Sequence, residues 1–262
     1  MTFAAGLAAA GMRPVVAIYS TFLQRGFDNI IHDIALQNLP VVMCIDRAGL
    51  NSGDGATHHG IFDVAFLSGL PNVRIYTPAT FDSLRFAIDE AFELKQPAAI
   101  RYPSGVEDPK VVCSFEHNGE AVKIQKEIPD DCDTLIIAHG RMVSTALEVC
   151  DILKQNDVSA AVMMLERLTP FDDIASQIAN AATDYVNDIV FVEEEIRSGG
   201  MGMMLSDAIK RLCLDRNIKH SIIAVSDPFV RCEQNMTYHE MNGLDPASIA
   251  DKVIKMKKEQ TT

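Results

Sequence analysis

The chain has 262 residues, of which 48% are hydrophobic and 23% charged, a composition typical of a folded protein of roughly two domains. Lys and Arg number 23 and Asp and Glu 36, giving a net charge of −13, so the chain lacks the basic surface needed for general nucleic-acid or anionic-membrane binding. No apolar run is long enough to span a membrane. The N-terminus lacks the features of a signal peptide, and the six cysteines form no CxxC pair, so we expect a cytoplasmic protein with reduced thiols.

Short β-branched runs alternate with longer amphipathic stretches in the first part of the chain. The apolar spacing around 27–34 predicts one helix, and a second is predicted over 80–94, between two prolines. The order of these elements predicts parallel strands joined by right-handed crossovers. The predicted strands, apolar throughout as in strands buried on both faces, are 15–20, 41–46, 73–77 and 98–102.

The alternation lapses between residues 103 and 133, where prolines and glycines predict a linker with a short strand near 121–124. It then resumes, with predicted strands at 134–138, 160–164, 189–193 and 222–225 and predicted helices at 143–155, 174–180, 203–214 and 246–258. We therefore predict an α/β fold with two tandem sheets, parallel with mixed edges. The predicted domains are 1–115 and 116–262.

Three of the predicted strands in the first domain are followed by an arginine: Arg25, Arg47 and Arg101. Ligands of parallel sheets bind beyond the carboxyl ends of the strands. If the sheet brings these side chains together, they can bind a phosphate or carboxylate through charge-assisted hydrogen bonds. The alternatives are a solvated helix residue for Arg25 and structural ion pairs for the other two.

The loops after these strands carry a family resemblance. The segments IYSTFLQRGFD (18–28), IDRAGLNSGDGATHHGIFD (45–63) and AIRYPSG (99–105) closely resemble the 1-deoxy-D-xylulose-5-phosphate synthases, a family of the transketolase superfamily. The match runs in order along the chain and is strongest over 2–104. It implies a transketolase-like pyrimidine-binding domain followed by a transketolase C-terminal domain.

The resemblance implies a transferase that uses thiamine diphosphate and Mg²⁺. Such an enzyme condenses pyruvate with glyceraldehyde 3-phosphate, releases carbon dioxide, and feeds isoprenoid (terpenoid), thiamine and pyridoxal biosynthesis. Members of the family are homodimers. The cofactor supplies the difficult chemistry, and the protein supplies position and electrostatics.

The resemblance also implies roles for individual residues. Phe22 is expected to stack on the aminopyrimidine ring of the cofactor, and Asp54 and His58 to face the reacting carbons. The residues expected to hold the substrate phosphate are Tyr19, Arg25, Arg47 and Arg101. His59 is expected at the surface. From the residues alone, Asp54 could equally form the turn of its Gly-Asp-Gly segment, and Phe22 could be a core residue.

Two features of the family do not occur in this sequence. One is the Gly-Asp-Gly…Asn motif of a separate N-terminal domain, which holds the cofactor's diphosphate and its Mg²⁺; no metal ligand is therefore expected here. The other is a Glu-Gln-His-Ala segment, whose Glu protonates the aminopyrimidine ring and which would stand just before Met1. We expect the chain to be inactive or nearly so by itself. A mis-assigned GTG start codon or a broken gene is one hypothesis for the missing segment.

Three further hypotheses are compatible with the sequence. The chain could be one subunit of a split enzyme whose partner carries the thiamine-diphosphate domain, a section of another transketolase-type enzyme, or a non-catalytic remnant that binds a phosphorylated metabolite. In the second domain, Glu193-Glu194-Glu195 and Gly199-Gly200 resemble the family's strand-end acids and glycine turn. We expect these residues to be structural.

Overall fold

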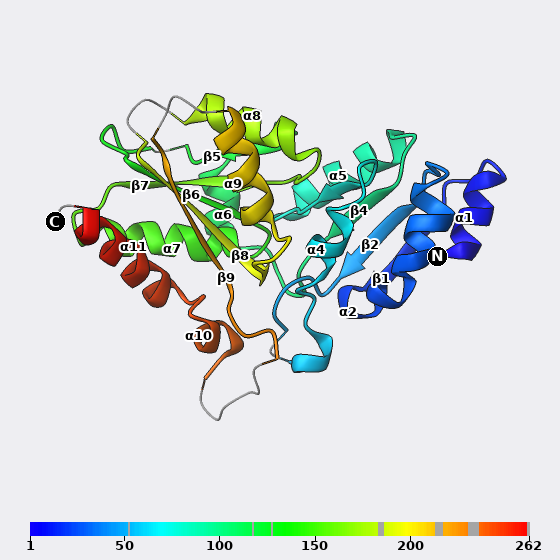
Figure 1. Cartoon of the computed structure of the whole chain (residues 1–262), viewed down its shortest axis with the longest axis horizontal. Helices are drawn as coiled ribbons and strands as arrows, with labels where there is room; N and C mark the ends of the chain where they lie inside the picture. Colours follow the sequence, from blue (N-terminus) through cyan, green and yellow to red (C-terminus); the bar gives the residue numbers. More distant parts are fainter. Residues whose placement is uncertain are drawn as a thin grey trace.

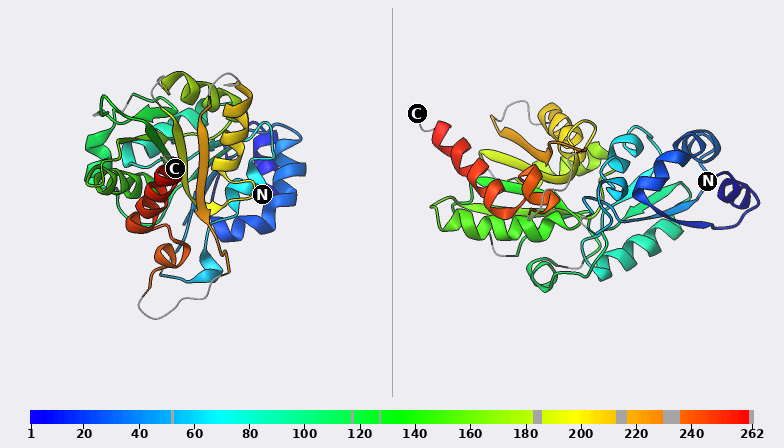
Figure 2. Two further views of the ribbon diagram at one scale, coloured as in Figure 1. Left: turned by 60° about the vertical axis from the view of Figure 1, so that its left-hand side comes forward. Right: turned by 90° about the horizontal axis from the view of Figure 1, so that it is seen from below.

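The computed structural model describes residues 1–51, 53–116, 118–126, 128–182, 186–212, 217–229 and 236–260. Two α/β units lie next to each other along an elongated molecule, and the chain termini are near its opposite ends (Figures 1 and 2). The helices of the described ranges include none with the length and apolar character needed to cross a membrane.

The first unit is built on a four-stranded sheet in which every pairing is parallel, as predicted. The strand order is β1-β2-β4-β3. Since all four strands point the same way, their carboxyl ends meet at one edge of the sheet. The strands are β1 (Val15–Tyr19), β2 (Val42–Asp46), β3 (Arg74–Tyr76) and β4 (Ala98–Arg101).

Helical segments surround this first sheet. The helix predicted between the first two strands is present, but it begins earlier, at Ser20, and consists of short segments of different pitch. Helix α5 begins where predicted, because Thr80 and Ser83 form a reciprocal capping box. The segments are α1 (Thr2–Ala9), α2 (Ser20–Leu23), η1 (Gln24–Gly26), α3 (Phe27–Asn29), η2 (Ile30–Ala35), η3 (Ala56–His58), α4 (Asp63–Leu67) and α5 (Phe81–Glu93).

The second unit is built on a five-stranded sheet of order β5-β7-β6-β8-β9. All its pairings are parallel except that of β5 with β7, which confirms a parallel sheet with a mixed edge. Its strands are β5 (Val122–Ile124), β6 (Thr134–His139), β7 (Ala160–Leu165), β8 (Asp188–Ile196) and β9 (Lys219–Val225). Its helices are α7 (Met142–Lys154), α8 (Phe171–Ala181), α9 (Met201–Leu212), α10 (Tyr238–Asn242) and α11 (Pro246–Gln260).

Helix α6 (Pro109–Ser114) lies in the segment predicted to be a linker, so that prediction is wrong at this point. Asp108 caps the helix by accepting a hydrogen bond from the amide of Lys110, and Pro109 occupies the first helical position. The short strand predicted near 121–124 is present as β5. Residues 213 and 214 of the predicted helix 203–214 lie outside the described residues.

Apolar side chains join the two units. The largest buried cluster includes Met43 and Ile45 of the first sheet and Ile137 and Phe191 of the second. A second cluster lies beneath α7 and α11, and a third fills the space between the first sheet and α5. Tyr76, the last residue of β3, forms a backbone bridge with Arg167 of the second unit, so the carboxyl edge of the first sheet lies against that unit.

Candidate active site between the two sheets

Two aromatic rings, one at the last residue of β1 and one in α2, form what we call the aromatic wall of the candidate site. The rings of Tyr19 and Phe22 are stacked, with centroids 5.6 Å apart, and the ring of His58 meets Phe22 edge-on at 5.5 Å. The side chain of Phe22 is 39% exposed, so it is not a core residue. An aromatic ring with an accessible face is suited to stacking on a flat heterocycle.

Arg47 lies where β2 ends and contacts this wall. Its backbone has a φ of 57°, in the left-handed region, and its amide donates a 2.7 Å hydrogen bond to the carboxylate of Asp46. The guanidinium is 4.5 Å above the ring of Tyr19 and donates a 3.1 Å hydrogen bond to its hydroxyl. The turn therefore directs a permanent cation toward the aromatic wall.

The residues after Arg47 form what we call the site loop, residues 49–51 and 53–60. Reciprocal 2.8 Å backbone hydrogen bonds between Gly49 and Gly60 close the loop at its base. Within the loop, the side chain of Asn51 accepts hydrogen bonds from the amides of Gly53 and Asp54 and donates one to the carboxylate of Asp54. These bonds hold the carboxylate of Asp54 in place beside Asn51.

Asp54 and His58 point from the site loop to the other predicted residues. The carboxylate of Asp54 forms a 3.0 Å ion pair with Arg47, and both side chains are partly exposed. His58 contacts Phe22, as described above, and its Nδ1 is 2.9 Å from the hydroxyl of Thr57. The structure thus brings together five of the seven predicted site residues, namely Tyr19, Phe22, Arg47, Asp54 and His58.

Arg25 and Arg101 are placed differently from those five. Arg25 is exposed on η1 and takes no part in the contacts that join the cluster. Arg101 is buried, with its guanidinium 3.0 Å from Asp63 and 2.5 Å from Glu195. Burial alone would lower the pKa of Arg101, but these two carboxylates outweigh it and raise the pKa. The geometry therefore favours the structural ion pair for Arg101.

His59 is buried, not at the surface, so that expectation is wrong. Its Nδ1 accepts a 2.9 Å hydrogen bond from the amide of Asn51, and its ring meets Tyr238 edge-on at 4.4 Å. Burial lowers the pKa of His59, which keeps the ring neutral and able to accept. His59 therefore supports the inside of the site loop, while its neighbour His58 faces the aromatic wall.

Residues of the second unit that sequence reasoning did not assign to the site also contact the loop. Glu194, at the end of β8, accepts a 3.1 Å hydrogen bond from the amide of Leu50. Arg141 donates a 3.0 Å hydrogen bond to the carbonyl of Leu50, and His239 lies 3.2 Å from Glu194. The run of three acids at a strand end was the only signal in the sequence for this contact.

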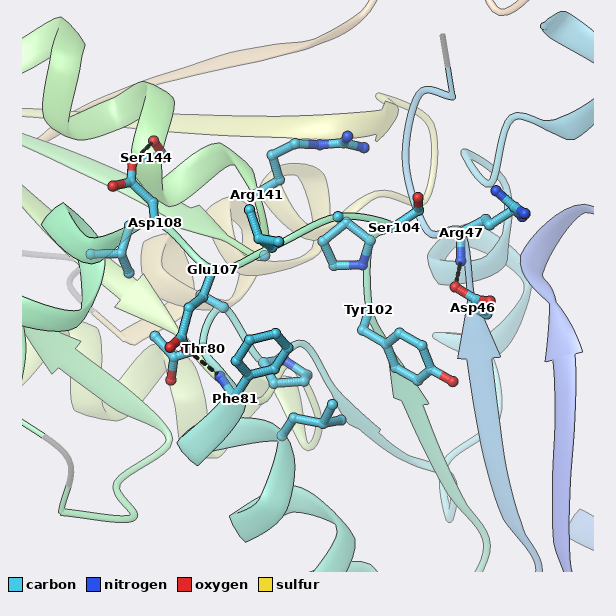
Figure 3. A pocket seen from close by; sticks show the side chains of 18 residues that line it. Asp46, Arg47, Thr80, Phe81, Tyr102, Ser104, Glu107, Asp108, Arg141 and Ser144 are labelled. Atoms are coloured by element: carbon cyan, nitrogen blue, oxygen red, sulfur yellow. Dashed lines mark hydrogen bonds between the residues drawn. The ribbon is translucent and has the colours of Figure 1, made fainter. Parts of the chain in front are cut away.

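A cavity of about 610 Å³ opens next to Arg47, between the two units (Figure 3). Arg47 and Arg141 both line it, with Tyr102 and Ser104 on the segment between them. Two of its carboxylates are already engaged as helix caps, Glu107 by the amide of Phe81 and Asp108 by Lys110 and Ser144. With Asp46 as a third carboxylate, the cavity is lined by two arginines, three hydrogen-bonded acids and apolar side chains.

One group of His and acidic side chains within the described ranges is close enough to hold a metal ion: His139, Glu193 and Glu195. All three are buried, and Glu195 is already paired with Arg101 and with His139, at 3.2 Å. Burial, and then the charge of Glu195, raises the pKa of Glu193 well above its usual range. These features do not fit the exposed oxygen ligands that a magnesium diphosphate requires. The face of Phe22 does fit the pyrimidine end of thiamine diphosphate.

Residues 1–106 match the transketolase pyrimidine-binding domain family, and residues 122–249 match the transketolase C-terminal domain family. Curated relatives include 1-deoxy-D-xylulose-5-phosphate synthases from Syntrophomonas wolfei and Clostridium botulinum (strain Eklund 17B / Type B), 38% and 36% identical over 97% and 98% of this chain. The chain spans about 40% of the length of these relatives: 39% of the first and 40% of the second.

Solved structures show the same architecture. A chain described as split gene transketolase, inactive beta4 tetramer, superposes with a TM-score of 0.79 and 26% identity, over 97% of this chain and 79% of that one. A Pichia stipitis transketolase mutant in complex with xylulose 5-phosphate superposes with a TM-score of 0.77 over 95% of this chain and 35% of its own; at 18% identity this shows the fold alone. The chain therefore belongs to the transketolase family and comprises that family's pyrimidine-binding and C-terminal domains.

Proposed function

We propose that the chain supplies the pyrimidine-binding and C-terminal domains of a 1-deoxy-D-xylulose-5-phosphate synthase. This enzyme condenses pyruvate with glyceraldehyde 3-phosphate, with loss of carbon dioxide, for isoprenoid biosynthesis. The observation that carries the proposal is the convergence of Tyr19, Phe22, Arg47, Asp54 and His58 at one sheet edge. The naming of the curated relatives as synthases supports the choice of this reaction.

The proposed roles follow from the chemistry of each side chain. When bound, thiamine diphosphate supplies the carbon nucleophile, and the exposed face of Phe22 holds its aminopyrimidine ring. Arg47, held against Tyr19, binds the phosphate of the acceptor aldehyde through forked, charge-assisted hydrogen bonds. Binding that remote phosphate orients the aldehyde over the cofactor, which converts binding energy into rate.

Asp54 and His58 are proposed to hold or move protons at the oxygens of the acceptor. Both side chains come from the site loop, where Asp54 pairs with Arg47 and His58 contacts Phe22. Arg25 is proposed as a second, exposed cation for the substrate phosphate. Arg101 is proposed to act indirectly, by fixing the end of β4 through its buried ion pairs.

The diphosphate and Mg²⁺ ligands and the acidic residue that activates the cofactor are proposed to come from the part of the relatives' length that this chain does not span. That part can belong to the same polypeptide or to a separate chain, and the active enzyme can be a homodimer or such a mixed assembly. The split-gene transketolase, described as an inactive beta4 tetramer, shares this fold over 97% of this chain and 79% of its own length, which supports the mixed assembly.

Reconstitution tests the proposal. The purified chain would be assayed for product from pyruvate and glyceraldehyde 3-phosphate with thiamine diphosphate and Mg²⁺. The assay would be repeated after adding a chain that carries the N-terminal part of the Syntrophomonas wolfei relative. We expect no turnover by the chain alone and synthase activity in the mixture, abolished by His58→Ala.

The controls distinguish the competing functions. Turnover by the chain alone would show that it does not need a further domain. Activity of the mixture with ketose donors but not with pyruvate would identify a transketolase instead. Binding of a sugar phosphate without cofactor-dependent turnover in any mixture would indicate a non-catalytic remnant.

A further inference from the structure

We propose that Glu194, in the second unit, is a positioning residue that holds the site loop in the conformation in which Asp54 pairs with Arg47 and His58 meets the aromatic wall. This inference deepens the proposed function and rests on it for its catalytic consequence. It arises from a buried carboxylate that the proposed chemistry does not otherwise use.

The three consecutive acids of β8 divide their contacts between two faces of the strand, because side chains alternate along a strand. Glu193 accepts a hydrogen bond from the amide of Gly202, and Glu195 pairs with Arg101. Glu194 points the other way and reaches Leu50 in the first unit. All three acids are buried, but only Glu194 contacts the site loop.

Glu194 and Arg141 satisfy both backbone groups of Leu50. The amide donates to the Glu194 carboxylate at 3.1 Å, and the carbonyl accepts from Arg141 at 3.0 Å. Arg141 also bonds the carboxylate itself, at 3.2 Å and 3.4 Å. A buried backbone segment held at both its donor and its acceptor has little freedom to shift.

The neighbouring glycine shows how closely the carboxylate approaches the loop. Gly49 has a φ of 87°, and a Cβ at this position would overlap the carboxylate of Glu194. The position therefore requires glycine for two reasons, its backbone conformation and the lack of space. Such close approach lets Glu194 act on the main chain of the loop.

The charge of Glu194 is secured by its partners. Burial would raise the pKa of this carboxyl, but the charge of Arg141 and the hydrogen bond from His239 outweigh it and lower the pKa. Glu194 is thus ionised at neutral pH, and its hydrogen bond to the Leu50 amide is charge-assisted.

Leu50 is joined through the chain to Asn51, whose hydrogen bonds lead to Asp54, one of the two predicted catalytic side chains. The next residue, Asn51, donates its amide to His59 and organises Asp54 through its side chain. Asp54 in turn pairs with Arg47. A displaced Leu50 would move Asn51 and so misplace Asp54.

The first test measures hydrogen–deuterium exchange on the full chain, without cofactor or partner. Glu194→Ala should speed exchange of the Leu50 amide by about 10–100-fold, since it removes a hydrogen bond to a charged group. Peptides from β7 should be unaffected. Glu194→Gln keeps an acceptor oxygen and should restore part of the protection. The matched control is Glu193→Gln, which alters a buried acid of the same strand that has no contact with the loop.

Two results would overturn the proposal: unchanged protection of the site loop in Glu194→Ala, or a uniform loss of protection across both sheets, which would indicate general destabilisation. If Glu194→Ala does not fold, Arg141→Lys replaces it. A lysine cannot bond the Leu50 carbonyl and the carboxylate with the same fork, so selective loosening of the loop is again expected.

The second test uses the reconstituted enzyme. Glu194→Ala should lower kcat by about 100-fold at saturating substrate, the size of effect expected from a misplaced catalytic group, while the Kd for thiamine diphosphate stays unchanged. Full kcat despite a loosened loop would refute the positioning role. Absence of synthase activity in the parent mixture would instead refute the proposed function, and the exchange data would still decide whether Glu194 holds the loop.

Discussion

Arg101 Nη2 lies 2.5 Å from Glu195 Oε1, and this buried ion pair joins β4 of the first sheet to β8 of the second. Asp63 holds the other side of the same guanidinium at 3.0 Å, and His139 lies 3.4 Å away. Arg101, which directly follows the apolar part of its strand, is therefore bound by ion pairs at the boundary between the two units.

Replacing Arg101 with methionine should lower the free energy of unfolding by about 3–5 kcal/mol, because it leaves Asp63 and Glu195 buried without their cation. Urea denaturation of the full chain measures this loss. Arg211→Met is the matched control: its pairs with Asp172 and Asp207 are exposed and should contribute less than about 1 kcal/mol. If Arg101→Met instead had the stability of the parent and a raised KM for phosphorylated substrates, Arg101 would be a phosphate-binding residue.

Replacing Arg47 with alanine should leave stability nearly unchanged and impair substrate binding, the reverse of what we expect for Arg101. Arg47 and Asp54 are partly exposed and their ion pair is screened by solvent, so the free energy of unfolding should stay close to that of the parent. In the reconstituted enzyme, KM for glyceraldehyde 3-phosphate should rise by about 10–100-fold, the effect of losing charge-assisted bonds, while KM for an unphosphorylated aldehyde changes little. Lys110→Ala, which removes another exposed ion pair, serves as the control. Equal changes for both aldehydes would argue against phosphate binding.

Replacing Phe22 with leucine should weaken binding of thiamine diphosphate to the reconstituted enzyme by about 3–10-fold, through loss of aromatic stacking. Phe22→Tyr keeps the ring and should bind nearly as the parent does. Calorimetric titration gives both Kd values, with Phe3→Leu as an exposed aromatic control. Equal Kd values for the leucine and tyrosine variants would show that the ring does not stack on the cofactor.

Glu193→Gln should flatten the dependence of stability on pH. The raised pKa of Glu193 means that the folded chain retains a proton that the unfolded chain releases, so stability falls as pH rises from the usual glutamate pKa of 4.5 toward the raised value. A glutamine has no proton to retain. Its stability should therefore match or exceed that of the parent at the upper end of this window, as measured by urea denaturation at a series of pH values. If the free energy of unfolding changed with pH in the same way in the parent and in Glu193→Gln, Glu193 would not be protonated in the folded chain.

The sheets could be predicted from the sequence because their strands are short, apolar throughout and separated by amphipathic helices. Helix α6 was missed although Asp108 and Pro109 provided a cap and a first-turn proline, since its single short turn lies among linker-like residues. Where a helix changes pitch, as between Ser20 and Ala35, periodicity indicates the helix but not its start.

The site was predictable where its residues follow strands of one parallel sheet. Tyr19 and Arg47 meet because β1 and β2 are neighbours with a matching register. The same reasoning could not tell from the sequence that Arg101 and Arg47 have different roles. Arg47 has left its strand in a left-handed turn, whereas Arg101 is the last residue of β4 and meets Glu195 from a distant part of the chain. Glu194 and His59 were missed for the same reason: their partners come from the other unit or from inside a loop.

The acids at the end of β8 have a consequence for how the polypeptide acquires its structure. Glu194 and Glu195 obtain partners from the first unit, the amide of Leu50 and the guanidinium of Arg101. A protein cut between residues 115 and 116 would deprive its second half of both. In that half, the carboxylates of Glu194 and Glu195 would have to be hydrated or protonated, although they lie near the end of a strand inside the sheet. The two halves should therefore be poor autonomous folding units and should unfold together in one cooperative transition.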